Sequence, residues 1–523
     1  MWSSTQSPPG APWTDCCLIK RIRMLPPVGS KQELKELSNL AGPVIIATFM
    51  SFAVGFVSTV FCGHLGRVEL ASVSLAISVI NVTGISVGIG LAAACDTLMS
   101  QNYGSRNFMQ IGVLLQRAAL ILILACFPCW AILINTELIL LAVGQEPEVA
   151  RLAQMYVKIF MPALPVSISK TYMTLGIIWP EVFTGFVVNL LNALLNYIFL
   201  YPLNLGVAGS AIANTLSQFC MAGILFAYIV CNGLHKATWA GWSKECLQDW
   251  DSYIHLAIPS MIMMCVEWWT YEIGGFLAGL INEVELGAQS VIYQMANIFP
   301  IGISIAGNVR VGNALGARET EQAKLSAKVS MLCAGMCYDS KGDLVRYQCM
   351  IFIWEFYWVF LLSLNTSLSF LHDQAASGGI IRGAGKQKIG AVCNILGYYG
   401  VGFPVGVSLM FAAKQGIKGL WIGLVTCLFL QTSFLMVYLL RLNWTKVTEE
   451  VADDSDDSNH SDIHMDTLAL FKNKEKPVMW VVKRKPSQRT LVLRRALALA
   501  VMLFILVVGL VVNLSIISNE VNP

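Results

Sequence analysis

The sequence contains few charged residues and little excess of either sign. Only 13% of its 523 residues are charged, whereas 56% are hydrophobic. Soluble domains carry about 25% charged residues. The 35 Lys and Arg against 32 Asp and Glu leave a formal net charge of +3, too small a surplus for a nucleic-acid-binding surface. A soluble fold and a nucleic-acid partner are therefore excluded, and we expect the partners to be lipid and small solutes.

Sequence motifs of common enzyme and cofactor classes are also missing. Neither the phosphate-binding GxxxxGK[ST] pattern nor the zinc-binding HExxH pattern occurs. The 15 cysteines lack the spacings of a zinc site or a secreted disulfide framework, and Cys126-Phe127-Pro128-Cys129, which has redox-motif spacing, lies within an apolar run. We therefore expect neither an enzyme nor a cofactor or metal site, and we interpret most cysteines as small packing residues.

Long apolar runs, in contrast, occur along most of the chain. The hydrocarbon core of a bilayer is about 30 Å thick, so a spanning helix needs about 20 apolar residues. Unpaired backbone in lipid is too costly for other open structures, and the sequence therefore predicts an all-α polytopic membrane protein. The candidate spans are 41–62, 70–95, 117–135, 152–170, 181–201, 207–231, 255–281, 286–309, 388–413, 418–440 and 496–514.

Basic residues beside the apolar runs predict the orientation of the chain. The first 40 residues are polar, rich in proline and include several lysines and arginines before any long apolar run. This pattern favours a cytosolic amino terminus over a cleavable signal peptide. Arg494 and Arg495 immediately precede the last run, which predicts a final spanning helix with an extracellular carboxyl terminus.

These features divide the chain into six parts. Within the second lobe we expect 332–372 to be irregular, because Asp339–Gln348 is polar and Cys349–Leu364 is marginal in length for a span. The parts are a cytosolic amino-terminal segment (1–33), a first transmembrane lobe (34–235), a cytosolic linker (236–254), a second transmembrane lobe (255–445), a polar cytosolic tail (446–493) and a terminal transmembrane helix (494–523).

An internal repeat relates the two lobes. The matching pairs are Leu40–Pro43 with Leu256–Pro259 at an offset of 216, Tyr103–Arg106 with Leu315–Arg318 at 212, and Gly206–Gly209 with Gly416–Gly419 at 210. The second copy has therefore lost four residues between the first two pairs. Similar composition alone does not explain nearly constant offsets that include Pro and Gly. We predict two homologous parallel repeats of about six helices, related by an axis along the membrane normal.

Two glutamates inside an apolar run are the main functional candidates, because ionisable residues at mid-membrane depth are costly. Glu267 and Glu272 lie about 12 and 17 residues from the start of the seventh run, and five helical positions turn them about 140° apart. A carboxylate in a low-dielectric cavity can exchange a proton near neutral pH and, when ionised, attracts a cation. The neighbouring Trp268, Trp269 and Tyr271 offer ring faces to organic ammonium groups. We therefore expect proton and cation binding here, and a structural hydrogen-bonding role is the alternative.

The first lobe has no carboxylate at the equivalent positions, which are Ser51 and Phe56. The two lobes are therefore expected to be functionally unequal. The polar candidates of the first lobe to line the cavity are Asn81, Thr83 and Asp96. For Asp96, which ends the second run, the alternative is a helix-terminal polar pair with Thr97. His64 follows the first run, and we expect it in an exposed loop.

Several segments resemble the multidrug and toxic compound extrusion family, specifically its animal proton-coupled organic cation antiporters. The resemblance covers most of 34–330 and 376–445. The segments that carry it are Phe61–Gly66, Ala94–Leu98, Phe160–Pro165, Ala257–Met261, Glu267–Trp269, Val311–Gly316 and Arg382–Lys388.

The resemblance implies two six-helix lobes around a central cavity, with one extra carboxy-terminal helix, in the plasma membrane. It also implies export of organic cations such as drugs, toxins and cationic metabolites in exchange for protons, by alternating access. The family's acidic positions in the second lobe fall on Glu267 and Glu272; a third falls on Gln294, and a fourth is expected near Asp373.

Two other functions are compatible with the sequence. Coupling to sodium is one, because oxygen-bearing side chains such as Asn81, Thr83 and Asp96 can ligate that ion. A transport-impaired isoform or scaffold that associates with full-length transporters is the other, because 332–372 does not look like the family's ninth and tenth helices. A pH gradient without sodium separates the first alternative from proton coupling.

Overall fold

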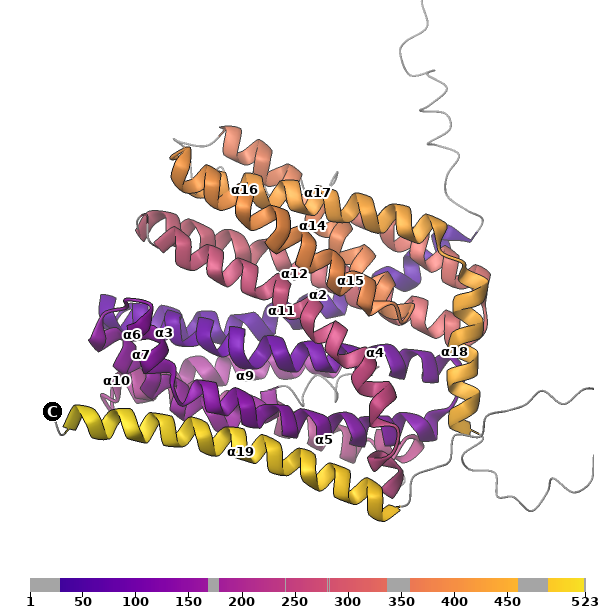
Figure 1. Ribbon diagram of the computed structural model, residues 1–523, viewed down its shortest axis with the longest axis horizontal. Coiled ribbons are helices and arrows are strands. Elements are labelled where there is room, and N and C mark those ends of the chain that lie inside the picture. Colours follow the sequence, from indigo (N-terminus) through magenta and orange to yellow (C-terminus); the bar gives the residue numbers. More distant parts are fainter. Residues whose placement is uncertain are drawn as a thin grey trace, which may run out of the picture.

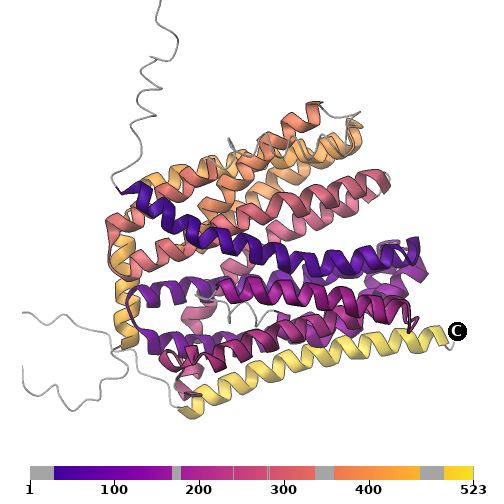
Figure 2. The same ribbon diagram turned by 180° about the vertical axis from the view of Figure 1, so that it is seen from behind.

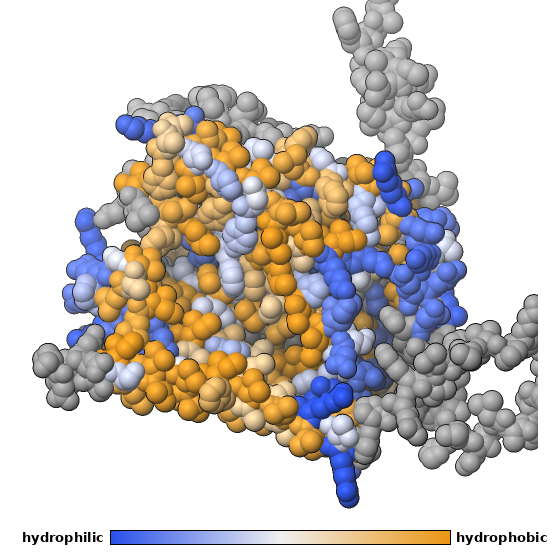
Figure 3. All heavy atoms as spheres, viewed as in Figure 1, coloured by the Kyte–Doolittle hydropathy of each residue, from blue (hydrophilic) through white to orange (hydrophobic). Residues whose placement is uncertain are grey.

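The computed structural model describes residues 29–167, 178–239, 241–279, 281, 283–335, 358–459 and 488–521. All regular secondary structure in these ranges is helical. Eight helices in the described ranges are long and apolar enough to cross a membrane. Apolar side chains form a broad band across the molecule, and polar ones gather toward its ends (Figure 3). The predicted all-α polytopic fold is therefore confirmed.

The first lobe begins with α2, which starts at Ser30, four residues before the boundary that we predicted from the sequence. Its helices are α2 (Ser30–Gly63), α3 (Arg67–Ile80), the π-helical η2 (Asn81–Ile85), α4 (Ser86–Gly104), α5 (Phe108–Leu133), α6 (Thr136–Ala142), α7 (Pro147–Phe160), η3 (Met161–Ala163), α9 (Ile178–Leu200) and α10 (Gly206–Cys231).

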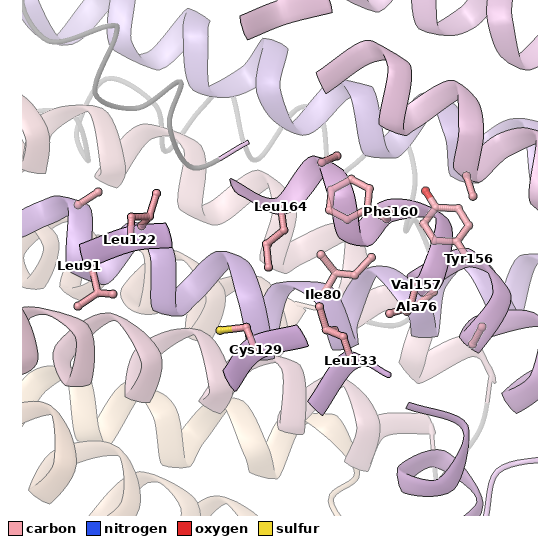
Figure 4. Close-up of a cluster of buried hydrophobic side chains, with 14 of the residues drawn as sticks. Ala76, Ile80, Leu91, Leu122, Cys129, Leu133, Tyr156, Val157, Phe160 and Leu164 are labelled. Atoms are coloured by element: carbon pink, nitrogen blue, oxygen red, sulfur yellow. The ribbon is translucent and has the colours of Figure 1, made fainter. Parts of the chain in front are cut away.

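Buried apolar side chains join α3, α4, α5 and α7 into one core (Figure 4). Leu122, Cys129 and Leu133 recur on one face of α5 at spacings of seven and four residues. Tyr156 and Phe160 are four residues apart on α7, so they face the same core. The interpretation of Cys129 as a packing residue agrees with this position.

The second lobe follows a short linker that contains η4 (Leu234–Ala237) and η5 (Lys244–Leu247). Its segments are α11 (Trp250–Gly279), α12 (Glu283–Gly316), a helical segment over 320–335, α14 (Trp358–Gly383), α15 (Gln387–Asn394), η6 (Ile395–Gly402), α16 (Phe403–Val407), η7 (Ser408–Ala412) and α17 (Ile417–Arg441). Together, α15 to η7 form one candidate span, Gln387–Ala412.

The stretch expected to be irregular, 332–372, is in part regular. Residues 332–335 and 358–372 are helical, and α14 packs against α12 and α17. Residues 336–357 lie outside the described residues. Where it is described, this part of the second lobe is therefore built into the helical bundle.

The internal repeat reappears in the backbone. Left-handed conformations, which are rare for residues other than glycine, occur at Arg106 (φ 59°) and Arg318 (φ 62°), 212 positions apart. They occur again at Asn204 (φ 48°) and Lys414 (φ 54°), 210 positions apart. Both offsets equal those of the sequence matches, so equivalent loops of the two lobes turn in the same way.

The four residues missing from the second copy correspond to about one helical turn. The second membrane segment of the first lobe, Arg67–Gly104, has 38 residues, whereas its equivalent, α12, has 34. Only the first copy is interrupted by a π-helical turn, η2. The π-helical turn η2 has no counterpart in α12, which supports unequal roles for the two lobes.

The two segments meet in a contact with approximate two-fold symmetry. A Cβ atom on Gly104 would lie 2.1 Å from the carbonyl oxygen of Asn313, and one on Gly316 would lie 1.9 Å from that of Gln101. Gly104 and Gly316 are equivalent in the repeat, and so are Gln101 and Asn313. Both positions therefore require glycine for the lobes to approach this closely.

We refer to the end of the bundle where α2 begins and where α4 and α12 end as the amino-terminal face. In both ribbon views the helices of the two lobes converge at this face and diverge toward the opposite one (Figures 1 and 2). Helix α18 (Trp444–Asn459) covers the second lobe here, and Lys386 Nζ lies 2.5 Å from Glu450 Oε2. The described contacts between lobes thus hold the amino-terminal face closed.

Helix α19 (Gln488–Val521) packs along α5 on the outside of the first lobe (Figure 1). Arg495 lies over the ring of Trp250, 4.2 Å from its centroid, at the amino-terminal face. Near its other end, Gly509 contacts Ala131, and Asn513 donates to the carbonyl oxygen of Ile134 (3.1 Å). The predicted extra carboxy-terminal helix is therefore present and runs from one face of the bundle to the other.

Candidate functional site

Glu267 lies near the middle of α11, and its side chain is partly exposed. Its neighbours Cys265, Val266 and Thr270 are buried. The carboxylate interacts electrostatically with Arg382 of α14. We therefore expect the exposed part of its surface to face the inside of the molecule, and its role in lining a cavity between the lobes stays a prediction.

Glu272, about one and a half turns further along α11, connects the two lobes. Asn81 Nδ2 of the first lobe donates a hydrogen bond to Glu272 Oε1 (3.2 Å). A hydrogen bond to a carboxylate is stronger than one between neutral groups. The structure therefore brings together two of the predicted site residues that are 191 positions apart in the sequence.

Trp269 also contacts the first lobe. Its indole Nε1 donates to the carbonyl oxygen of Val82 (2.9 Å) and lies 3.3 Å from Ser86 Oγ. Val82 belongs to the π-helical turn η2, and such turns interrupt the regular hydrogen-bond ladder and are frequent at functional sites. The turn thus presents a backbone acceptor to the second lobe at the level of the predicted site.

Asp96 lies in α4, not at the end of that helix, and its side chain is partly exposed. Its Oδ1 is buried and has no hydrogen-bond partner among the described residues. The next residue, Thr97, accepts a hydrogen bond from Gln387 Nε2 of the second lobe (3.2 Å). Of the two interpretations open from the sequence, a position at the lobe interface agrees better with these contacts than a helix-terminal pair.

Two other aromatic candidates lie on α11. Trp268 is partly exposed, whereas Tyr271 is buried in the second lobe beside Tyr398, with ring centroids 6.3 Å apart. Contact between these rings and a cation stays a prediction.

The remaining candidates differ in exposure. Thr83 donates to the carbonyl oxygen of Val79 within its own helix (2.7 Å). His64 is exposed just after α2, and its Nδ1 lies 2.9 Å from the carbonyl oxygen of Val60. Asp373 is partly exposed on α14. The side chain of Gln294 lies outside the described residues.

Arg382, at the carboxyl end of α14, was missed as a site residue in the sequence. It is buried, donates to Ser304 Oγ (2.6 Å) and interacts electrostatically with Glu267 and Asp96. The sequence places it beside Gly383 and Lys386, which resembles an ordinary loop boundary. The apolar pair Ile380-Ile381 directly before Arg382 was the feature of the sequence that could have indicated its burial.

A second group missed in the sequence is an ion-pair network at the amino-terminal face. Glu33 of the first lobe is 3% exposed and binds Arg310 of α12 through both carboxylate oxygens. Gln322 and Ser326 donate to the same carboxylate. A pocket of about 420 Å³ opens beside Arg310 and Gln322 at this face. This pocket lies among the residues that close the amino-terminal face and does not include the carboxylates of α11.

A polar cluster inside the first lobe was also missed. Asn192 and Asn196 of α9 are fully buried with Ser58 of α2 and Ser217 of α10. Asn192 Nδ2 donates to Ser217 Oγ (3.1 Å), and Asn196 Nδ2 lies 3.3 Å from Ser58 Oγ. These polar residues occur singly among apolar neighbours, so the sequence did not indicate that they form a cluster. No group of three or more His, Cys, Asp or Glu that could hold a metal ion occurs in the described part of the chain.

Two repeat-related helical lobes with carboxylates at their interface are typical of membrane transporters. A model of the MatE family matches residues 43–201 and 259–338. The chain is 58% identical over 451 residues to Multidrug and toxin extrusion protein 1 of Danio rerio, covering 82% of this chain and 76% of that protein. It is 46% identical over 558 residues to the Rattus norvegicus protein of the same name, covering 97% and 98%.

The chain therefore belongs to the MatE family of multidrug and toxin extrusion transporters and is not an enzyme. A crystal structure of the eukaryotic MATE transporter AtDTX14 is similar in fold, with a TM-score of 0.75 and 27% identity over 82% of this chain and 99% of that one. The alignment to the rat relative is longer than the 523 residues of this chain. That relative therefore has residues with no counterpart here.

Proposed function

We propose that the chain is a proton-coupled antiporter that exports organic cations from the cytosol across the plasma membrane by alternating access. The observation that carries the proposal is the position of Glu267, a carboxylate near the middle of the 30-residue helix α11 that interacts electrostatically with Arg382. Relatives named multidrug and toxin extrusion proteins support the export of compounds.

A single carboxylate can serve both ions in turn. In a medium of low dielectric constant, an uncompensated carboxylate is costly, so it takes up either a proton or a cation. Competition between the two for Glu267 would make release of one depend on binding of the other. Trp268, which is partly exposed beside it, supplies a ring face for an organic ammonium group.

Alternating access requires the contacts between the lobes to break on one side. The described hydrogen bonds between the lobes run from Asn81–Glu272 to Glu33–Arg310 at the amino-terminal face. Opening the amino-terminal face would separate these partners and expose the carboxylates to the solution on that side of the membrane. The structure therefore corresponds to a state closed at the amino-terminal face, which we place in the cytosol.

The experiment is uptake of a fluorescent organic cation into proteoliposomes whose internal and external pH are set independently. Proton coupling predicts uptake driven by an acidic interior in sodium-free buffer, and loss of this uptake in Glu267→Gln. Glu321→Gln, at a largely exposed side chain, is the matched control. Uptake that follows a sodium gradient but not a pH gradient would contradict the proposal and favour sodium coupling.

A further inference from the structure

Arg382 is a buried cation to which no carboxylate of the described residues is hydrogen-bonded. The residue is 9% exposed, and its guanidinium donates to Ser304 Oγ (2.6 Å) and to Met264 Sδ (3.4 Å). Both partners are neutral. An arginine buried among neutral groups is costly, so nearby negative charge must stabilise it.

On the first-lobe side, two hydrogen bonds hold the end of α14 against α4. Gln387 Nε2 donates both to the carbonyl oxygen of Arg382 (3.1 Å) and to Thr97 Oγ1 (3.2 Å). Gln101 Nε2 donates to the carbonyl oxygen of Gly383 (3.1 Å). Thr97 directly follows Asp96, so this arrangement places the guanidinium near the Asp96 carboxylate, which interacts electrostatically with it.

On the second-lobe side, the guanidinium contacts α11 one turn before Glu267. Met264 and Glu267 are three positions apart, so they lie on the same face of the helix. The electrostatic interaction of Arg382 with Glu267 follows from this position. The guanidinium therefore lies between one carboxylate from each lobe.

The other helices packed against Arg382 present neutral groups to it. Helix α12 contributes Ser304, and α15 contributes Gln387. Among the described residues, the charged groups that face Arg382 are Asp96 of α4 and Glu267 of α11. When both carboxylates are ionised, their two negative charges exceed the single positive charge of Arg382 by one.

We propose that Arg382 is a resident cation of the transport site, a positioning residue that keeps the Asp96 and Glu267 carboxylates ionised when no substrate is bound. An arriving organic cation or proton neutralises the one remaining negative charge. Arg382 thereby sets the pH range in which substrate and proton compete. This proposal rests on the proposed exchange of organic cations for protons.

The alternative is that Arg382 only holds α14 in place through Ser304 and Met264. The direction in which the pH of half-maximal transport moves separates the two roles. Removing the positive charge favours protonation of both carboxylates, so Arg382→Gln should move half-maximal transport to higher pH by about one unit. Removing a like charge has the opposite effect on Glu267, so Asp96→Asn should move it to lower pH.

The test is the pH profile of cation uptake into proteoliposomes for Arg382→Gln, Arg382→Lys, Asp96→Asn and the double variant Asp96→Asn/Arg382→Gln. We expect Arg382→Lys to keep the wild-type profile and the double variant to return close to it, because its charge balance is restored. Equal amounts of folded protein are verified by size-exclusion chromatography.

The outcomes are distinguishable. Wild-type protein without pH-dependent uptake would overturn the proposed function and this proposal together. A pH-dependent wild type whose Arg382→Gln variant loses rate without a shift in profile, or whose double variant does not move back, would overturn the role of Arg382 alone. If Arg382→Gln and Asp96→Asn do not fold, Arg382→Lys and the double variant still decide, because a purely structural arginine predicts no recovery in the double variant.

Discussion

Single charged side chains occupy three levels along the interface between the lobes. Glu33 and Arg310 lie at the amino-terminal face, Glu267 lies deeper together with Arg382, and Glu272 lies furthest from that face, bonded to Asn81. The effect of removing a charge should depend on its level. Charges at the face stabilise a closed state, whereas the deeper ones can bind the transported ions.

Glu272→Gln should reduce transport without abolishing it. A glutamine oxygen still accepts a hydrogen bond from Asn81, so the contact between the lobes persists, but the side chain can no longer exchange a proton. We expect initial uptake rates to fall about tenfold, corresponding to about 1.4 kcal/mol, with pH dependence retained through Glu267. Uptake that loses its pH dependence entirely would mean that Glu272, not Glu267, carries the proton.

Glu33→Gln should destabilise the protein at the amino-terminal face. It removes a charged partner of Arg310, Gln322 and Ser326, and charged hydrogen bonds of this kind contribute about 1.5–3 kcal/mol. Thermal unfolding in detergent should therefore shift to lower temperature.

Glu321→Gln is the control for this measurement, because it breaks an exposed ion pair with Lys324, which contributes little. The double variant Glu33→Gln/Arg310→Met should be more stable than Glu33→Gln, since no unpaired arginine is left. Equal shifts for Glu33→Gln and Glu321→Gln would show that the buried network does not hold the lobes together.

Sequence could identify the acidic residues of α11 but not their partners. Glu267 and Glu272 interrupt an apolar run, and such an interruption can be recognised from the sequence alone. Glu33 lies in a polar segment, and its ion pair with Arg310 depends on residues 277 positions away. Interactions of this kind follow from how the helices pack, which local composition does not encode.

Among the helices, α19 has a contact with the bundle that rests on one small residue. A Cβ atom on Gly509 would lie 2.8 Å from Ala131 Cβ and 3.0 Å from its carbonyl oxygen, closer than ordinary contacts. Asn135 Nδ2 donates to the carbonyl oxygen of Gly509 (3.0 Å) at the same place. Small residues permit this close approach of membrane helices.

Gly509→Ala should therefore loosen α19 from α5 and lower the unfolding temperature in detergent by a few degrees, as for a loss of about 1 kcal/mol. Gly223→Ala in α10 is the control, because a Cβ atom there meets nothing within 4 Å and alanine favours the helix. An unfolding temperature of Gly509→Ala equal to that of wild type would contradict the packing of α19 on α5.

The helices of the bundle were largely predictable, because each spanning run is a local signal. The expected spans 388–413 and 418–440 correspond to Gln387–Ala412 and Ile417–Arg441. The π-helical turn η2 was not predictable, since Asn81–Ile85 has no residue that breaks a helix other than Gly84. Within this turn, the carbonyl oxygen of Val82 accepts from Trp269 of the other lobe, a contact that no local pattern reveals.

At the scale of the whole molecule, the repeat and the direction of α19 predict which side each terminus occupies. Helix α19 begins beside Trp250 at the amino-terminal face and ends near Ile134. With the basic residues Arg494 and Arg495 at its start, that face should be cytosolic.

A tag after Pro523 should therefore bind antibody on intact cells, and a tag before Met1 should bind only after permeabilisation. The two tags serve as controls for each other. Labelling of both tags only in permeabilised cells would mean that α19 does not cross the membrane. Labelling of the amino-terminal tag alone on intact cells would invert the proposed orientation.

The two lobes have the same architecture but different chemistry. Helix α11 carries Glu267 and Glu272, whereas the equivalent positions of α2 are Ser51 and Phe56. At this level the first lobe contributes the Asn81 side chain and the carbonyl group of Val82, which contact the second lobe. Proton coupling through α11 is therefore the central claim.

The most direct measurement is cation uptake by proteoliposomes of wild type and Glu267→Gln under an imposed pH gradient without sodium. Coupling through Glu267 predicts uptake by wild type that reverses direction with the gradient, and no response to the gradient in the variant at equal protein content. Normal pH-driven uptake by Glu267→Gln would contradict the assignment.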